Sequence, residues 1–259
     1  MIGNAQIAMM VAQAAFGILG PVILLLVLRY RYGMKVEAFV IGCIIMLVFA
    51  MVLEGAVHRL VLGSSAGAVI TGNTLYYAFY GASMAALFEE VGRFTAFHVL
   101  MKHMHGDDRN AIMYGAGHGG FEVFMILGMT GISNIALATS VNSGSLPEYT
   151  DETAAMMEQS VEVLKNTAAS AYLLGMVERV SAVMLQIALS IIVWQTVKQL
   201  KGRFLFLILA MLLHFAVDFA TVILTSMIPL AVYEVMLLAV SVIILLLALK
   251  LYRKNIGVR

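Results

Sequence analysis

Residues 230–249 read LAVYEVMLLAVSVIILLLAL, a run with a single charged side chain, Glu234. A helix needs about 20 mostly apolar residues to cross the hydrocarbon core of a bilayer, so this run predicts a transmembrane helix. The whole chain has the same character. Of its 259 residues, 62% are hydrophobic and 12% are charged, whereas a soluble domain has about 45–50% and about 25%. This composition excludes a soluble enzyme, a nucleic-acid-binding domain and a disordered linker.

Around that run, the sequence predicts one all-α integral membrane domain over residues 1–259, a polytopic transmembrane helix bundle of about seven spans. The longest connection, 132–168, is acidic, and its second half has Met157, Val161 and Leu164 at helical spacing. It is predicted to be an outer loop that contains an amphipathic helix. The predicted spans are 5–28, 36–53, 69–101, 111–131, 169–197, 204–226 and 230–250.

Basic residues predict the orientation of the bundle. If the spans alternate, 12 of the 16 Lys and Arg residues fall in loops on one side. By the positive-inside rule that side is the cytosol, which places the N-terminus outside and the C-terminus in the cytosol. The twelve are Arg29, Arg31, Lys35, Lys102, Arg109, Lys198, Lys201, Arg203, Lys250, Arg253, Lys254 and Arg259.

Ionisable side chains inside the predicted spans mark the candidate site. Each costs about 2.5–3.5 kcal/mol near the bilayer centre, so each is a functional candidate. Outside this set, Glu54, Glu234 and Trp194 are predicted to lie at membrane interfaces. The candidates are Glu89, Glu90 and Arg93 in LFEEVGRFTAFH, His118 and Glu122 in YGAGHGGFEVF, Glu178 and Arg179 in GMVERVSA, and His214 and Asp218 in MLLHFAVDFA.

Depth and spacing predict that several of these side chains meet. Counted from the cytosolic ends of their spans, Glu89, His118 and His214 lie about 8–12 residues in, or roughly 12–18 Å deep. Arg93 can pair with either Glu89 or Glu90 on its own helix, because the spacings are i,i+4 and i,i+3.

Each of the two histidines also has an acid one turn away, Glu122 after His118 and Asp218 after His214. Such a carboxylate would orient the imidazole on its own helix. The glycines at 115, 117, 119 and 120 predict either close helix packing or a cavity beside His118.

Two kinds of hydrolytic chemistry use these residue types. In one, a glutamate activates water as a general base and a histidine stabilises the oxyanion. In the other, His118, His214 and Glu122 bind zinc, whose water attacks the substrate. The chain lacks the H-E-x-x-H zinc motif, and the spacings do not separate the two mechanisms.

The ordered motifs also resemble known families. EEVGR, then GHGGFE, then ER and HFAVD, over about residues 85–220, are similar to the YhfC family of predicted intramembrane metalloproteases, and more distantly to the CPBP (CAAX protease and bacteriocin-processing) intramembrane proteases. The resemblance implies an intramembrane peptidase of the bacterial cytoplasmic membrane. Glu89 or Glu90 would activate the water, Arg93 would hold the other acid, and His118 and His214 would bind water, oxyanion or metal. In this comparison Asp218 follows the last histidine by one turn, whereas Glu122, Glu178 and Arg179 match only the YhfC pattern and would support the site.

The expected partners are membrane lipid and a peptide or membrane-protein substrate, with no nucleic acid. A proton- or cation-coupled transporter is the main alternative, because buried acids and histidines are typical of proton relays. Against it, the chain shows no internal repeat and no Gly/Pro-broken helices of the kind many transporters have. A non-catalytic membrane scaffold is the third interpretation.

Overall fold

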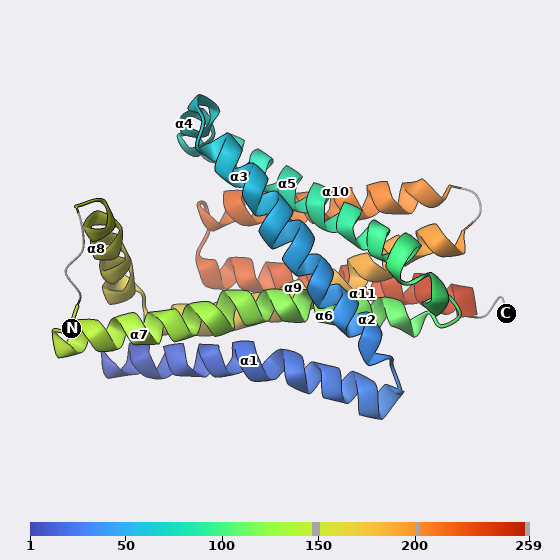
Figure 1. Ribbon diagram of the computed structural model, residues 1–259, viewed down its shortest axis with the longest axis horizontal. Helices are drawn as coiled ribbons and strands as arrows, with labels where there is room; N and C mark the ends of the chain where they lie inside the picture. The colour runs from blue at the N-terminus through green and yellow to red at the C-terminus, as the bar shows by residue number, and fades with distance from the viewer. Residues whose placement is uncertain (147–150, 200–201, 257–259) are drawn as a thin grey trace.

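The computed structural model describes residues 1–146, 151–199 and 202–256, and these ranges form helices without a strand. Long helical rods alternate in direction along the long axis of the molecule (Figure 1). We call one end the α8 end, with residues 63–73, 226–229 and helix α8, and the other the C-terminal end, with residues 33–35, 101–108 and the end of α11. The elements are α1 (Asn4–Tyr32), α2 (Val36–Ile45), η1 (Met46–Glu54), α3 (Gly55–Leu62), α4 (Ser65–Thr71), α5 (Thr74–Thr95), η2 (Ala96–Leu100), η3 (Lys102–Met104), α6 (Arg109–Val123), η4 (Phe124–Met129), α7 (Thr130–Ser143), α8 (Asp151–Asn166), α9 (Ala169–Lys198), α10 (Arg203–Thr225) and α11 (Leu230–Ile256).

Six helical segments in the described chain are long and apolar enough to cross a membrane, and an all-α polytopic membrane bundle is therefore confirmed. The rod formed by α5 and η2, where a further span is predicted, is not among them. It carries the charged residues Glu89, Glu90 and Arg93. The six segments are Asn4–Tyr32, Val36–Leu62, Arg109–Ser143, Ala169–Lys198, Arg203–Thr225 and Leu230–Arg253.

The structure differs from the predicted range 69–101 at its start. Helix α4 ends at Thr71, and α5 begins only at Thr74. Asn73 causes the new start, because its side-chain oxygen accepts hydrogen bonds from the backbone N–H groups of Leu75 (2.9 Å) and Tyr76 (3.2 Å). Asn is among the most favoured residues at a helix N-cap, and a hydropathy scan does not register such a cap.

The predicted outer loop 132–168 also begins too early. Helix α7 continues the preceding span to Ser143 and ends at Gly144, whose φ of 68° is left-handed. Glycine adopts this conformation at no steric cost and therefore commonly ends a helix. Helix α8 has Val161 and Leu164 buried, and its far end is held to α1 by Gln6, whose side-chain nitrogen donates to the carbonyl oxygen of Thr167 at 2.7 Å.

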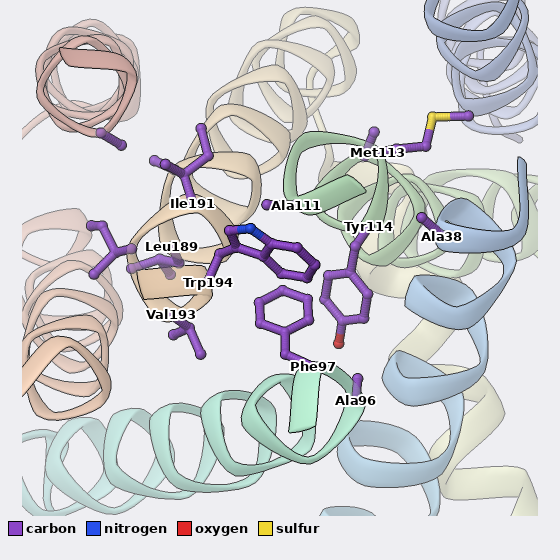
Figure 2. Close-up of a cluster of buried hydrophobic side chains, with 14 of the residues drawn as sticks. Ala38, Ala96, Phe97, Ala111, Met113, Tyr114, Leu189, Ile191, Val193 and Trp194 are labelled. Carbon is purple, nitrogen blue, oxygen red and sulfur yellow. The ribbon is translucent and has the colours of Figure 1, made fainter. Parts of the chain in front are cut away.

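An aromatic core closes the C-terminal end of the bundle. Phe97 of η2 contacts Tyr114 of α6 and Trp194 of α9, each pair with ring centroids 4.8 Å apart (Figure 2). The prediction that Trp194 is an interface anchor is wrong. Trp194 is 1% exposed, and its indole N–H donates to Asp108 at 3.0 Å. A tryptophan with an available acceptor can be fully buried.

Glu54 and Glu234 are also buried within the protein, and their position at a membrane interface stays a prediction. Glu54 contacts His58 Nε2 at 3.1 Å, so it has a polar partner one turn along its own helical rod. A partner of this kind makes burial of a carboxylate less costly.

Candidate active site

Four helices position the candidate site at one level of the bundle. Depth is counted from the helix end that lies nearest the C-terminal end of the bundle. Glu89 lies eleven residues from the end of η2 at Leu100, and His118 lies nine residues from the start of α6 at Arg109. Gln186 lies twelve residues from the end of α9 at Lys198, and His214 lies eleven residues from the start of α10 at Arg203. At about 1.5 Å per residue these offsets are similar in depth. Hydrogen bonds join all four helices at this level, so the predicted meeting of Glu89, His118 and His214 is present in the structure.

Glu90 is held on all sides. Arg93 Nη1 donates to both of its carboxylate oxygens, at 2.5 and 2.6 Å, and the Glu90 and Arg93 side chains are 0% exposed. His214 Nδ1 lies 2.9 Å from Glu90 Oε1. A carboxylate enclosed in this way has its charge balanced and has no contact with water. Glu90 therefore fixes the position of His214 and Arg93.

Glu89 has a different environment. Its Oε2 is 3.0 Å from His118 Nε2 and accepts a hydrogen bond from Gln186 Nε2 at 2.8 Å. His214 Nε2 lies farther away, 3.9 Å from the same oxygen. In the described structure both hydrogen bonds of this carboxylate end on Oε2, and the side chain lines a cavity. The other oxygen, Oε1, is therefore the one open to a water molecule.

The contacts of His118 define which of its nitrogens carries a proton. The residue is 0% exposed, and Nδ1 has no hydrogen-bond partner within the described ranges. A neutral imidazole has one N–H and one acceptor nitrogen. We assign the proton to Nε2, because it then donates to Glu89, and an unpaired buried N–H on Nδ1 would be costly.

Gln186 joins the two halves of the site, and it was not among the predicted residues. Its Oε1 accepts from Arg93 Nη2, and its Nε2 donates to Glu89 Oε2 and, at 3.5 Å, to Glu122 Oε2. One amide can therefore bridge a guanidinium and two carboxylates, because it carries both a donor and an acceptor. A search restricted to charged residues overlooks a neutral amide, although Gln186 lies seven residues, about two turns, after Arg179 on the same helix.

Glu122 does not orient His118, contrary to the prediction. It accepts instead from Arg179 Nη1 at 2.6 Å, and Arg179 Nη2 donates to Glu178. A full guanidinium charge is a stronger partner for a carboxylate than an imidazole N–H. Glu122, Glu178 and Arg179 thus form a second polar cluster on the α8 side of Glu89.

His214 and Asp218 are neighbours as predicted. His214 Nε2 lies 3.4 Å from Asp218 Oδ2, one turn along α10. The imidazole therefore stands between two carboxylates, with Nδ1 toward Glu90 and Nε2 toward Asp218. Only Asp218 of these two acids is substantially exposed, at 36% of its side chain.

The glycines around His118 serve close packing. A Cβ on Gly117 would lie 2.0 Å from the Phe39 carbonyl oxygen, and one on Gly115 would lie 2.6 Å from Ile187 Cα. Neither distance is compatible with a side chain, so α6 contacts α2 and α9 backbone to backbone. Gly119 and Gly120 also face neighbouring helices at 3.1–3.2 Å. None of the four lines the cavity beside Glu89.

A cavity of about 290 Å³ lies on the α8 side of Glu89. Its polar wall consists of Glu89, Glu122, Glu178, Arg179, Gln186, His214, Asp218 and several hydroxyls. A second cavity, of about 580 Å³, lies under α8 and shares Glu178 with the first. The only glutamate of the EE pair that lines the first cavity is Glu89. Glu89 thus faces a polar cavity on its α8 side, and Glu178 lies between this cavity and the second one.

The predicted zinc ligands do not fit a metal centre as arranged. Glu122 is bound to Arg179, while His118 and His214 face Glu89 and Glu90. Within the described ranges no group of three or more His, Cys, Asp or Glu side chains is arranged to hold a metal ion. A catalytic zinc site takes three protein ligands and one open position.

The fold and the composition define a polytopic integral membrane protein with a buried cluster of acids and histidines. Comparison with known proteins identifies its family. The model of the YhfC intramembrane metalloprotease family matches residues 16–243, and the chain belongs to this family. It is 34% identical over 218 residues to the uncharacterized membrane protein YhfC of Bacillus subtilis (strain 168), with 83% of each chain covered. No solved structure matches. The six apolar helices and this relative are consistent with the bacterial cytoplasmic membrane.

Proposed function

We propose that this protein is an intramembrane peptidase in which Glu89 activates the attacking water. One observation carries the proposal: of the two adjacent glutamates, Glu89 lines the polar cavity, whereas Glu90 is enclosed by Arg93 and His214. A general base must reach the water from which it takes a proton. The family description as an intramembrane metalloprotease agrees with peptide hydrolysis as the reaction.

The reaction follows from the positions of these groups. Water bound at Glu89 Oε1 transfers a proton to the carboxylate as its oxygen attacks the carbonyl carbon of the scissile peptide bond. A carbon–oxygen bond forms, and the carbonyl electron pair moves to the oxygen. The electron pair on the oxygen then re-forms the carbon–oxygen double bond as the carbon–nitrogen bond breaks, and Glu89 returns the proton to the leaving nitrogen. One water is consumed, and a carboxylic acid and an amine are released.

Three neighbours position and assist Glu89. His118 and Gln186 hold Oε2, which leaves Oε1 directed to the water. His214 is held through Nδ1 by Glu90, and its Nε2 faces the cavity. A protonated imidazole donates from both nitrogens, and its Nε2–H, whose nitrogen lies 3.4 Å from Asp218 Oδ2, would be shared with the oxyanion. Arg93 acts through Glu90 and Gln186 without reaching the cavity.

The family description as an intramembrane metalloprotease favours a peptidase over the transporter alternative, and the position of the cavity is compatible with a peptidase. Here the cavity extends from Glu89 toward the α8 end, while Phe97, Tyr114 and Trp194 pack together between the site and the C-terminal end. A cavity on one side of the base can supply a hydrolase with water without a continuous path through the protein.

The proposal can be tested on all membrane proteins of a cell at once, so no substrate has to be chosen in advance. Cells that lack the protein are complemented with wild type or with Glu89→Gln, and new peptide termini in their membrane proteins are mapped by mass spectrometry. We expect a set of termini that requires the wild-type protein. Glu37→Gln, an exposed acid far from the site, is the matched control and should restore the set. Identical termini in wild-type and Glu89→Gln cells would refute the proposal.

A further inference from the structure

The half of the cavity toward α8 carries more negative than positive charge. Its wall contains Glu122, Glu178 and Asp218 and a single guanidinium, that of Arg179. Arg179 donates to both Glu122 and Glu178, so its one charge is divided between two carboxylates. Three ionised acids against Arg179 leave an excess of two negative charges, or of one where His214 beside Asp218 is protonated as in the proposed reaction. An excess of this kind in a low-dielectric wall attracts a cation strongly.

Asp218 is the acid with the least compensation. Its only ion-pair partner within 4 Å in the described chain is His214, whose Nε2 lies 3.4 Å away, and that imidazole also binds Glu90. The Asp218 side chain is 36% exposed, although the residue lies in the middle of a membrane-spanning helix. It therefore faces the space of the cavity, where a ligand would meet it.

A second, independent observation comes from helix α11, which also lines the cavity. Ser241 lines the same cavity, is 0% exposed, and its Oγ has no hydrogen-bond partner in the part of the chain described. Buried hydroxyls are nearly always paired, so an unpaired one in a cavity wall indicates a missing partner. A hydroxyl oxygen accepts hydrogen bonds, as the carboxylates beside it do. Ser241 thus offers a ligand an oxygen acceptor that has no partner within the described chain, in the cavity that the three acids also line.

We propose that this half of the cavity, with Glu122, Glu178, Asp218 and Ser241, is a subsite for a cationic side chain of the substrate, the ammonium of lysine or the guanidinium of arginine. This inference rests on the proposed peptidase function and names its substrate class. Ala82, Leu185 and Val217 provide apolar wall for the methylene stem, and the charged head meets the acids. The volume of about 290 Å³ is near the lower limit of small-molecule pockets, roughly 300 Å³.

The position of the subsite relates the cation to the bond that is cut. Asp218 follows His214 by one turn, about 6 Å along the helix axis. The cationic residue therefore lies within one or two residues of the scissile bond. A lysine or arginine is costly in the bilayer centre, and the subsite offsets that cost only for a substrate that carries the charge near the cleavage point.

The test uses three fluorescent single-span peptides that differ at one central residue: lysine, its uncharged isostere norleucine, or glutamate. Binding to the full-length protein in lipid nanodiscs is measured by anisotropy, and cleavage of the same peptides by mass spectrometry. We expect the lysine peptide to bind about tenfold more tightly than the norleucine peptide, as removal of one partner of a close charge pair commonly costs at least this factor. The glutamate peptide should bind most weakly.

Variants then assign the preference to the subsite. Asp218→Asn and Glu178→Gln should each reduce the lysine advantage to about threefold or less, and Ser241→Ala should reduce it in part, whereas the exposed-acid control Glu37→Gln should retain it. Thermal unfolding identifies the variants that are folded, and only the binding data of those variants are used to test the subsite.

Equal binding of the lysine and norleucine peptides by the wild-type protein overturns the subsite. An unchanged advantage of the lysine peptide in the folded variants also overturns it. Cleavage without charge preference would refute the subsite alone, whereas charge-selective binding without cleavage of any peptide would count against the peptidase.

Discussion

Glu90 binds Arg93 through both carboxylate oxygens, at 2.5 and 2.6 Å, and neither side chain is exposed to solvent. Removal of one partner of a buried ion pair leaves an uncompensated charge and costs about 3–5 kcal/mol. We therefore predict that Glu90→Gln lowers the stability of the protein markedly. Glu89→Gln should remain near wild-type stability, because the amide oxygen can still accept from His118 and Gln186, but it should lack activity.

Thermal unfolding in detergent, followed by circular dichroism, measures the first difference, and the mapping of peptide termini measures the second. Glu37→Gln again serves as the control for loss of an acid. If Glu90→Gln is stable and inactive while Glu89→Gln retains cleavage, the roles of the two glutamates are the reverse of those proposed.

The helical membrane fold could be predicted because its signal is local. A run of about 20 apolar residues has few structures available to it in a bilayer. The ends of the helices were harder to place. Asn73 and Gly144 determine where α5 begins and α7 ends, through a side-chain cap and a left-handed backbone, and neither feature alters the hydropathy of the segment.

Gln186 provides a prediction on stability and activity together. Gln186→Leu removes the acceptor for Arg93 and the donor to Glu89, and a buried polar group that loses its partner costs about 1–3 kcal/mol. We expect lower thermal stability and strongly reduced cleavage. Gln195→Leu is a matched control, because Gln195 is equally buried on the same helix but lies outside the site. Equal activity of the two variants would contradict a role for Gln186 in positioning Glu89.

The partners within the site were only partly predictable. Equal depth from the helix ends correctly suggested that Glu89, His118 and His214 meet. Depth does not, however, give the rotation of each helix about its own axis. That rotation turns Glu122 toward Arg179 and places His118 against Glu89, and it results from tertiary packing at the glycines of α6.

The contact of Gly117 with Phe39 gives a prediction on packing. A methyl group at Gly117 would lie 2.0 Å from the Phe39 carbonyl oxygen, so Gly117→Ala must separate α6 from α2. Because His118 is the next residue, its distance to Glu89 should change and activity should fall along with thermal stability. Gly55→Ala is the control: nothing lies within 4 Å of its added methyl, and alanine favours a helix by up to about 1 kcal/mol over glycine. A stable, active Gly117→Ala protein would contradict the close approach of the two helices.

The orientation of the bundle is open to a direct test. The positive-inside rule predicts that the α8 end, the side of Glu89 on which the cavity lies, faces outward. In a Cys43→Ala background, cysteine at Ser145 should react with a membrane-impermeant maleimide in intact cells. Cysteine at His103, which is exposed at the other end, should react only after the cells are opened. The reverse labelling pattern would invert the topology and place the cavity toward the cytosol.

Metal dependence is the remaining prediction, and it separates two kinds of hydrolase. Because Glu122 is bound to Arg179 at 2.6 Å, the predicted ligand set of His118, His214 and Glu122 does not converge. We expect cleavage to continue in the presence of a strong chelator. We also expect the purified protein to bind less than one zinc ion per chain when zinc is supplied. One zinc per chain, lost in both His118→Ala and His214→Ala, would establish a metal centre instead. Glu122→Gln then identifies the third ligand: zinc retained in that variant would place the ion on Glu89, since this carboxylate already lies 3.0 Å from His118 and 3.9 Å from His214.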